Sequence, residues 1–227
     1  MSFEERTTEL DAIAAAVRAC VKCQLHKGRT KAVPGAGPYN ADIMFIGEGP
    51  GYHEDQQGLP FVGASGKLLE EMLGKIGLKR DQVFITNVVK CRPPENRDPL
   101  PVEIETCTGN YLFRQIELID PKVIVTLGRF SMGLFFPGAK ISQIHGKAKW
   151  EKGRAYLPMF HPAAVLRSLE SMKPQYEVDF RKLPELVEQA KKDAKPAPSA
   201  PPTPETPKKD DDPPSGSSTP PKQLSLF

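Results

Sequence analysis

The sequence predicts an α/β fold: a single three-layer α/β/α domain with a four-stranded parallel sheet, followed by a disordered C-terminal tail. Short apolar runs at 42–47, 83–86, 122–127 and 156–160 alternate with longer amphipathic stretches. This alternation is typical of a parallel sheet that is covered by helices on both faces. From residue 195 the chain consists mainly of Pro, Ser, Thr, Lys and Asp, which cannot bury enough apolar surface to fold.

The composition divides the chain into a globular domain at 1–194, a Pro-rich linker at 195–222 and a terminal peptide at 223–227. The formal net charge of +3 permits a nucleic-acid partner without requiring one. The first residues lack the basic and apolar segments of a signal peptide, and no apolar run is long enough to span a membrane. We therefore expect a cytoplasmic protein, and a monomer.

The helices are predicted from caps and apolar spacing. Ser2 and Glu5 have the spacing of a capping box, and apolar residues then follow at helical intervals, which predicts a helix over 3–19. Ser65 is the expected cap of a second helix, which Gly77 ends. Further helices are expected over 101–118, 129–136, 163–171 and 175–193.

Chemically useful side chains follow three of the four predicted strands. Glu48 follows the first strand, Asn87 the second and His161 the fourth. Because ligands bind beyond the carboxyl ends of parallel strands, we expect an acid, an amide and an imidazole to converge there. The block at 47–66 is rich in glycine, so its backbone can approach a ligand closely, and Phe61 is expected on an exposed turn within it.

The chain has four cysteines, Cys20, Cys23, Cys91 and Cys107. In a cytoplasmic protein they are expected to bind a metal centre rather than to form disulfides. Four thiolates suit an iron–sulfur cluster or a structural zinc ion, and their spacing does not separate the two. A mixture of unrelated thiols is the alternative. Two arginines follow Cys91 closely and could reach DNA phosphates: Arg92 and Arg97.

Several separated motifs resemble the family 4 uracil-DNA glycosylases. They are Gly-Glu-Gly-Pro-Gly at 47–51, Gly-Leu-Pro-Phe-Val-Gly at 58–63, Thr-Asn-Val-Val-Lys-Cys-Arg-Pro-Pro at 86–94 and Phe-His-Pro-Ala-Ala at 160–164. The resemblance spans about residues 10–190. It implies a four-stranded parallel sheet, uracil-containing DNA as the substrate, and a [4Fe-4S] cluster on the four cysteines, with zinc as the second choice.

The resemblance implies a role for each site residue. Phe61 would stack on a uracil that has been flipped out of the duplex, and the Asn87 amide would pair with the uracil edge. Cytosine presents the reverse donor and acceptor pattern, so it would leave that amide unpaired. His161 would donate a hydrogen bond to the uracil oxygen that gains negative charge, and Glu48 would orient the attacking water or stabilise the cationic sugar.

Other residues would complete the substrate site. Gly49 would offer a backbone N–H to the base, and Glu54 would exclude the methyl group of thymine. Four residues of the 162–167 segment would enter the DNA groove: Pro162, Ala163, Leu166 and Arg167. A related branch forms a covalent adduct through a histidine on an inserted loop after the Asn motif. This chain has neither the insertion nor that histidine, so we expect turnover.

The last five residues resemble the bacterial sliding-clamp-binding motif, with Gln223, Leu224, Leu226 and Phe227 as the contact residues. Its position at the free end of a Pro-rich tether would hold the enzyme near replication sites. Two other functions compete with glycosylase activity. One is a non-catalytic, metal-containing DNA-binding module that senses lesions, and the other is hydrolysis of a free nucleotide.

Overall fold

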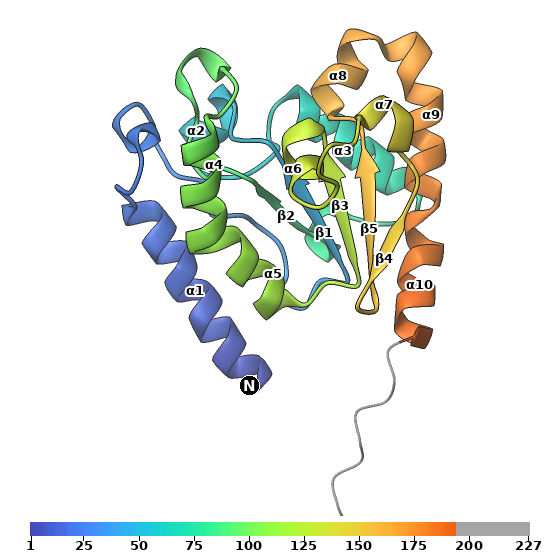
Figure 1. The fold of residues 1–227 in the computed structure, drawn as a ribbon, viewed down its shortest axis with the longest axis horizontal. Coiled ribbons are helices and arrows are strands. Elements are labelled where there is room, and N and C mark those ends of the chain that lie inside the picture. The colour runs from blue at the N-terminus through green and yellow to red at the C-terminus, as the bar shows by residue number, and fades with distance from the viewer. Residues whose placement is uncertain (194–227) are drawn as a thin grey trace, which may run out of the picture. The chain divides into compact units, whose positions relative to one another are not determined.

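The computed structural model describes residues 1–193 and contains a five-stranded sheet in the order β2-β1-β3-β5-β4 (Figure 1). β1 (Ile43–Gly47), β2 (Phe84–Asn87), β3 (Val123–Leu127) and β5 (Arg154–Met159) are parallel, as the sequence predicts. The prediction of four strands is wrong, because β4 (Lys149–Glu151) pairs antiparallel with β5 at the edge.

β4 has almost none of the features from which the other strands were predicted. It is three residues long, and the side chains of Lys149 and Glu151 are exposed on either side of the half-buried Trp150. The turn to β5 consists of Lys152 and Gly153, with φ angles of 51° and 75°. Two successive positive φ angles are typical of the tight turns that join antiparallel strands.

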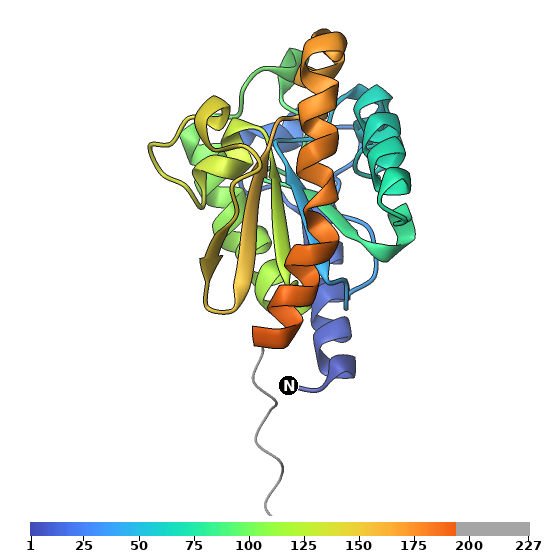
Figure 2. The same cartoon turned by 90° about the vertical axis from the view of Figure 1, so that its right-hand side faces the viewer.

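Helices cover both faces of the sheet (Figures 1 and 2). α1 (Phe3–Ala19), α4 (Pro101–Cys107) and α5 (Phe113–Ile119) lie on one face, and α3 (Ala64–Lys75), α9 (Leu169–Arg181) and α10 (Leu183–Asp193) lie on the other. Alternate residues of β1 divide between the two cores, since Phe45 packs with Phe180 and Met44 with Leu10. This alternation confirms the three-layer prediction. No helix within residues 1–193 is long and apolar enough to cross a bilayer.

Four shorter helices lie at the carboxyl edge of the sheet: α2 (Tyr52–Gln57), α6 (Arg129–Gly133), α7 (Ile141–Ile144) and α8 (Pro162–Arg167). Three 3₁₀ turns, at Gln24–Lys27, Arg80–Gln82 and Pro94–Asn96, and a π-helical turn, Thr108–Leu112, complete the described elements. The π turn joins α4 to α5, so the predicted helix over 101–118 is a continuous but irregular rod.

The predicted helix ends are confirmed in part. The capping box of α1 is present, with the Glu5 backbone N–H donating to Ser2 Oγ at 3.1 Å. Ser65 is not a cap, because α3 begins earlier and Gly63 is its N-cap. The gap expected between the helices over 163–171 and 175–193 is also wrong, since α9 spans it and includes Pro174. Tyr176 and Phe180 are almost completely buried in the core, and their packing stabilises the helix across the missing N–H.

A hydrogen bond between His145 and the buried Asp179 ties the end of α7 to α9. His145 Nδ1 lies 2.8 Å from Asp179 Oδ2, and the Asp179 side chain is fully buried. Lys182 contacts the other carboxylate oxygen at 3.2 Å. Phe160, the residue before His161, packs against the His145 ring with 4.4 Å between the ring centroids. These contacts stabilise the packing of the segment that follows β5.

Candidate active site

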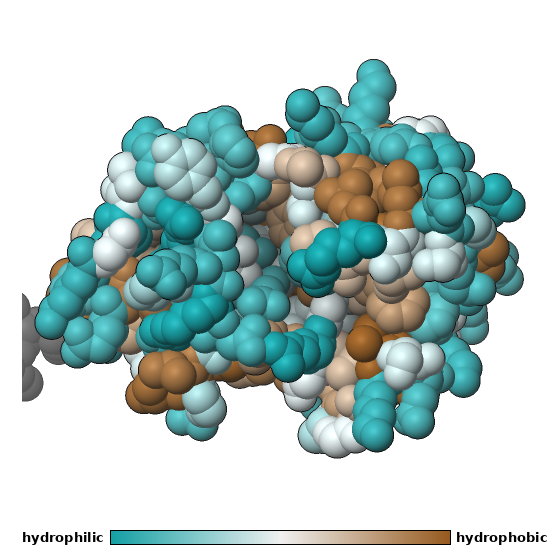
Figure 3. Space-filling model, turned by 90° about the horizontal axis from the view of Figure 1, so that it is seen from above, coloured by the Kyte–Doolittle hydropathy of each residue, from teal (hydrophilic) through white to brown (hydrophobic). Residues whose placement is uncertain are grey.

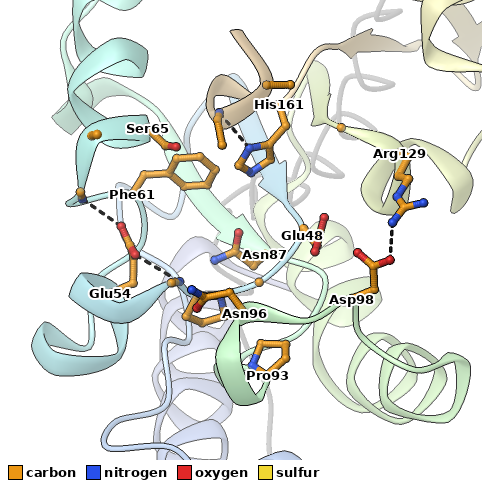
Figure 4. A pocket seen from close by; sticks show the side chains of 18 of the residues that line it. Glu48, Glu54, Phe61, Ser65, Asn87, Pro93, Asn96, Asp98, Arg129 and His161 are labelled. Carbon is orange, nitrogen blue, oxygen red and sulfur yellow. Dashed lines mark hydrogen bonds and ion pairs between the residues drawn. The ribbon is translucent and has the colours of Figure 1, made fainter. Parts of the chain in front are cut away.

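A cavity of about 730 Å³ opens at the carboxyl edge of the sheet and is visible from above as a hollow in Figure 3. Glu48, Asn87 and His161 all line it, which confirms that they converge (Figure 4). Three further predicted residues line it as well: Gly49, Glu54 and Phe61. The cavity is of the size that binds small organic ligands, and it is large enough for a nucleobase.

Asn87 brings an unpaired amide to the floor of the cavity. Its side chain is 1% exposed at the end of β2, and its Oδ1 atom has no hydrogen-bond partner among residues 1–193. A Cβ atom on Gly47 would lie 2.3 Å from this oxygen and 2.7 Å from the Phe61 ring. Only glycine therefore leaves room for both side chains. A buried amide oxygen without a partner is costly, which indicates that a ligand completes it.

Phe61 is buried, so the prediction of an exposed turn is wrong. The residue is 5% exposed and has a φ of 51°, and its ring centroid lies 5.8 Å from that of His161. The sequence reveals the turn but not what packs over it. α3 folds against the turn so closely that a Cβ on Gly66 would lie 1.8 Å from the Phe61 carbonyl oxygen. Figure 4 shows the ring facing the cavity beside the imidazole.

His161 is held as a neutral hydrogen-bond donor. It is the N-cap of α8, where its Nδ1 accepts a hydrogen bond from the Ala163 backbone N–H at 3.1 Å. Burial, assisted by the positive charge of Arg167 and opposed by the negative charge of Glu54, lowers the pKa of His161 to about 4. Because Nδ1 is an acceptor in a neutral ring, we infer that the proton is on Nε2. The ring therefore has one free N–H with which to meet a ligand.

Glu48 lies half-buried beyond the end of β1. Loss of solvent raises the pKa of its carboxyl group, the negative charge of Asp98 raises it further, and Arg129 opposes both effects. Asp98 and Arg129 form an ion pair at the rim of the cavity (Figure 4). Sequence reasoning missed both residues. Arg129 could have been found, because it comes just after β3 and thus follows a strand as Glu48, Asn87 and His161 do.

Glu54 lines the cavity, but its carboxylate is bound to the backbone. Oε1 accepts hydrogen bonds from the backbone N–H groups of Val62 and Gly63, both at 2.9 Å. Oε2 accepts one from Gly51 N–H at 3.1 Å. These three bonds tie the start of α2 to the turn after Phe61. Glu54 therefore stabilises the backbone of this turn, a role that is separate from the exclusion of thymine expected from the sequence.

The six predicted DNA contacts lie in different settings. Ala163, Arg167 and Arg97 line the cavity. Arg97 is also bound to the buried Glu103 carboxylate through two hydrogen bonds, of 2.8 and 3.0 Å. Arg92 donates to Asn96 Oδ1 at 2.8 Å and lies 5.3 Å from the Tyr52 ring. On α8, Pro162 is buried while Leu166 is 38% exposed.

The four cysteines come together at a second, smaller pocket between α1 and the chain after β2. Burial raises the pKa of Cys107 to about 11. Burial also raises the pKa of Cys91, against the effect of Arg29, which donates to Cys91 Sγ at 3.1 Å. Within residues 1–193 no three His, Cys, Asp or Glu side chains are placed around a single metal ion. The four cysteines nevertheless line this one pocket together.

Comparison with known proteins identifies the family. A profile of the uracil DNA glycosylase superfamily matches residues 34–183. The type-4 uracil-DNA glycosylase of Archaeoglobus fulgidus is 50% identical over 78% of this chain and 92% of its own length. That of Thermotoga maritima is 44% identical over 70% of the chain and 84% of its length. A type-5 enzyme of Pyrobaculum aerophilum is 31% identical over 59% and 66%.

The chain therefore belongs to the uracil DNA glycosylase superfamily, and its α/β/α fold with a cavity at the carboxyl edge of the sheet is consistent with that family. Over the aligned residues, the two type-4 enzymes are 50% and 44% identical to the chain, whereas the type-5 enzyme is 31% identical.

Proposed function

We propose that the protein is a type-4 uracil-DNA glycosylase. It flips uracil out of DNA and hydrolyses the N-glycosidic bond, the step that initiates base excision repair. The observation that supports this most strongly is the buried amide oxygen of Asn87, which lines a base-sized cavity and has no hydrogen-bond partner among residues 1–193. The ring of Phe61 and the imidazole of His161 flank that amide, in a chain whose relatives are named for this activity.

The base is recognised through its edge and its face. Asn87 Oδ1 accepts a hydrogen bond from uracil N3–H, and Nδ2 donates one to O4. Cytosine lacks the N3 proton and has an amino group in place of O4, so neither bond forms and the amide stays buried and unpaired. The Phe61 ring stacks on the base, and the Gly49 backbone contacts it from the chain that follows β1.

The bond between uracil N1 and the sugar C1′ breaks with its electron pair on the base. Negative charge develops on O2, where the His161 Nε2–H donates a hydrogen bond and keeps its proton. Positive charge develops on the sugar, facing the Glu48 carboxylate. Water adds to C1′ and loses a proton to Glu48, for which a raised pKa is favourable.

A uracil-release assay tests this function. We expect the full-length protein to release uracil from a single-uracil oligonucleotide and leave an abasic site. A denaturing gel is expected to show no heat-resistant protein–DNA adduct. Binding without release would instead support the lesion-sensing module, and release from deoxyuridine monophosphate equal to that from DNA would support nucleotide hydrolysis.

Activity is expected to fall on acidification at a pH set by Glu48. The ionised carboxylate is the active form, so kcat/KM rises with pH through the pKa of Glu48. Because burial raises that pKa, the acid limb lies above pH 4.5, the ordinary value for a glutamate. Glu48→Gln is expected to abolish the limb and to lower kcat by about 10²-fold or more, the usual scale for general base catalysis. The measurement is the pH–rate profile.

Variants of Asp98 and Arg129, the ion pair at the rim, test this prediction because they are expected to shift the acid limb in opposite directions. Asp98→Asn removes a negative charge that raises the pKa of Glu48, so the acid limb moves to lower pH. Arg129→Gln removes a positive charge that lowers the same pKa, so the limb moves to higher pH. Shifts of equal sign in the two variants contradict the assignment of the limb to Glu48.

We further propose that Cys20, Cys23, Cys91 and Cys107 hold a [4Fe-4S] cluster. All four thiols line one pocket, and an all-sulfur donor set suits such clusters. The Lys90 backbone N–H donates to Cys107 Sγ at 3.3 Å, a contact that stabilises negative charge on sulfur. The cluster would tie α1 to the loop that carries Arg92. Iron and sulfide analysis of anaerobically purified protein tests this, and one zinc per chain would contradict it.

We also propose that the terminal peptide binds a bacterial sliding clamp. Gln223, Leu224, Leu226 and Phe227 lie outside the described residues, so the support is their sequence alone. Deletion of 223–227 is expected to abolish retention on immobilised clamp while uracil release from a short oligonucleotide stays at the wild-type rate. Unchanged retention would show that the peptide is not the contact.

A further inference from the structure

The turn that carries Phe61 has an unfavourable backbone conformation. The φ of Phe61 is 51°, in the left-handed region that few residues other than glycine adopt. A bulky residue persists there only when its surroundings hold it. The contacts of this turn therefore decide where the ring lies in the cavity.

Arg80 holds the turn from one side. It begins the 3₁₀ turn Arg80–Gln82 before β2, and its guanidinium donates to two successive carbonyl oxygens. Nη1 donates to Phe61 O at 2.8 Å, and Nη2 donates to Pro60 O. The planar fork of a guanidinium matches two adjacent acceptors in a way that an ammonium does not. Within the described part of the chain, residues 1–193, its carboxylate partner is Glu70, at 3.3 Å on the surface.

Glu54 holds the same turn from the other side. While Arg80 binds the carbonyl groups of Pro60 and Phe61, the Glu54 carboxylate binds the N–H groups of Val62 and Gly63. The turn is thus held between a cation and an anion. Figure 4 shows Glu54 beneath the turn and the Phe61 ring projecting from it toward His161.

We propose that Arg80 is a positioning residue for uracil recognition: it holds the Phe61 ring parallel to the plane of the flipped base. The proposal rests on the glycosylase function and deepens it. Arg80 does not touch the base, and its side chain is 27% exposed at the back of the turn. Without it the backbone of Phe61 relaxes toward negative φ, and the ring turns away from the floor that Gly47 leaves open.

A double-mutant cycle with Phe61 tests the proposal. Base stacking on an aromatic ring contributes about 1–3 kcal/mol, so we expect Phe61→Ala to lower kcat/KM by roughly 5- to 150-fold. Arg80→Ala is expected to lose about tenfold, mainly through KM, and Arg80→Lys to recover part of it. In the Phe61→Ala background, Arg80→Ala is expected to cost less than about twofold, because it then has no ring left to position.

The matched control is Glu70→Gln, which removes the surface partner of Arg80 and leaves both carbonyl contacts. We expect it to keep the wild-type kcat/KM. Melting curves and assays well below the melting temperature exclude unfolding as the cause of a loss. Full activity in Arg80→Ala, or losses that multiply fully in the double variant, would overturn the proposal. Absence of uracil release by the wild-type protein would instead overturn the proposed function.

Discussion

Asn87→Ala is expected to lower kcat/KM for uracil release by about 10³-fold or more, on the scale seen when an active site loses a matched polar partner. In the proposed mechanism this substitution removes both hydrogen bonds to the uracil edge together, and these bonds are proposed to distinguish uracil from cytosine. Because the buried Oδ1 of Asn87 has no hydrogen-bond partner among residues 1–193, the native fold loses no protein hydrogen bond at that atom. The measurement is single-turnover release from a uracil-containing oligonucleotide.

Two further variants separate hydrogen bonding from packing. Asn87→Leu fills the same space without polar atoms and is expected to be as inactive as Asn87→Ala. Thr126→Val is the control, because Thr126 is also buried, on β3 of the same sheet, and its Oγ1 has no partner among residues 1–193, but it does not line the cavity. It is expected to keep full activity. Recovery of activity in Asn87→Leu would assign the effect to shape and would contradict edge recognition.

The sequence was sufficient to predict the four parallel strands, because each contains a short, mainly apolar run, which is buried on both faces in β1, β2 and β3 and partly buried in β5. It was also sufficient to bring Glu48, Asn87 and His161 together, because the carboxyl ends of parallel strands share one edge. β4 could not be predicted in the same way. An edge strand packs on one neighbour only, so its residues need not be apolar.

Predictions that depended on distant contacts were less successful. Phe61 was assigned to an exposed turn because its neighbours in sequence are Pro60 and Gly63. Its burial is caused by α3 and Arg80, which lies 19 residues away and binds the turn from behind. Likewise, nothing in the local sequence of Glu54 reveals that its oxygens bind N–H groups eight and nine residues further on. Such contacts exist only after the chain has folded.

The ion pair of Asp98 and Arg129 has the same origin. The two residues are 31 positions apart and meet only because α6 begins beside the loop before α4. Asp98 raises the pKa of Glu48 and Arg129 lowers it. The pair therefore adjusts the pKa of Glu48, although neither residue belongs to the motifs recognised in the sequence. The sequence motifs thus identify the candidate catalytic residues of this fold. The charged residues that change the pKa of those groups lie in the segments between the motifs.

His161→Ala is expected to lower kcat by roughly 10²- to 10³-fold, the usual cost of removing one donor to a developing oxyanion. KM is expected to change little, because the hydrogen bond strengthens only as charge moves onto the base. His161→Gln retains a side-chain N–H donor and is expected to recover part of the rate. His145→Gln is the control, since this second imidazole is paired with Asp179 outside the cavity. It is expected to keep the wild-type kcat with a lower melting temperature.

The pH profile distinguishes a neutral His161 from a charged one. With a pKa of about 4, the ring stays neutral at every pH above about 5, so it adds no inflection near 6.5. A charged donor would instead lose activity as the pH rose through its pKa. The pKa of His161 is about 4 in the folded state and 6.5 in the unfolded chain. As the pH falls from 6.5 toward 4, the unfolded chain therefore binds a proton that the folded state does not, and the free energy of unfolding decreases. His161→Gln is therefore expected to reduce acid sensitivity of the melting temperature, and an unchanged sensitivity would contradict the buried neutral ring.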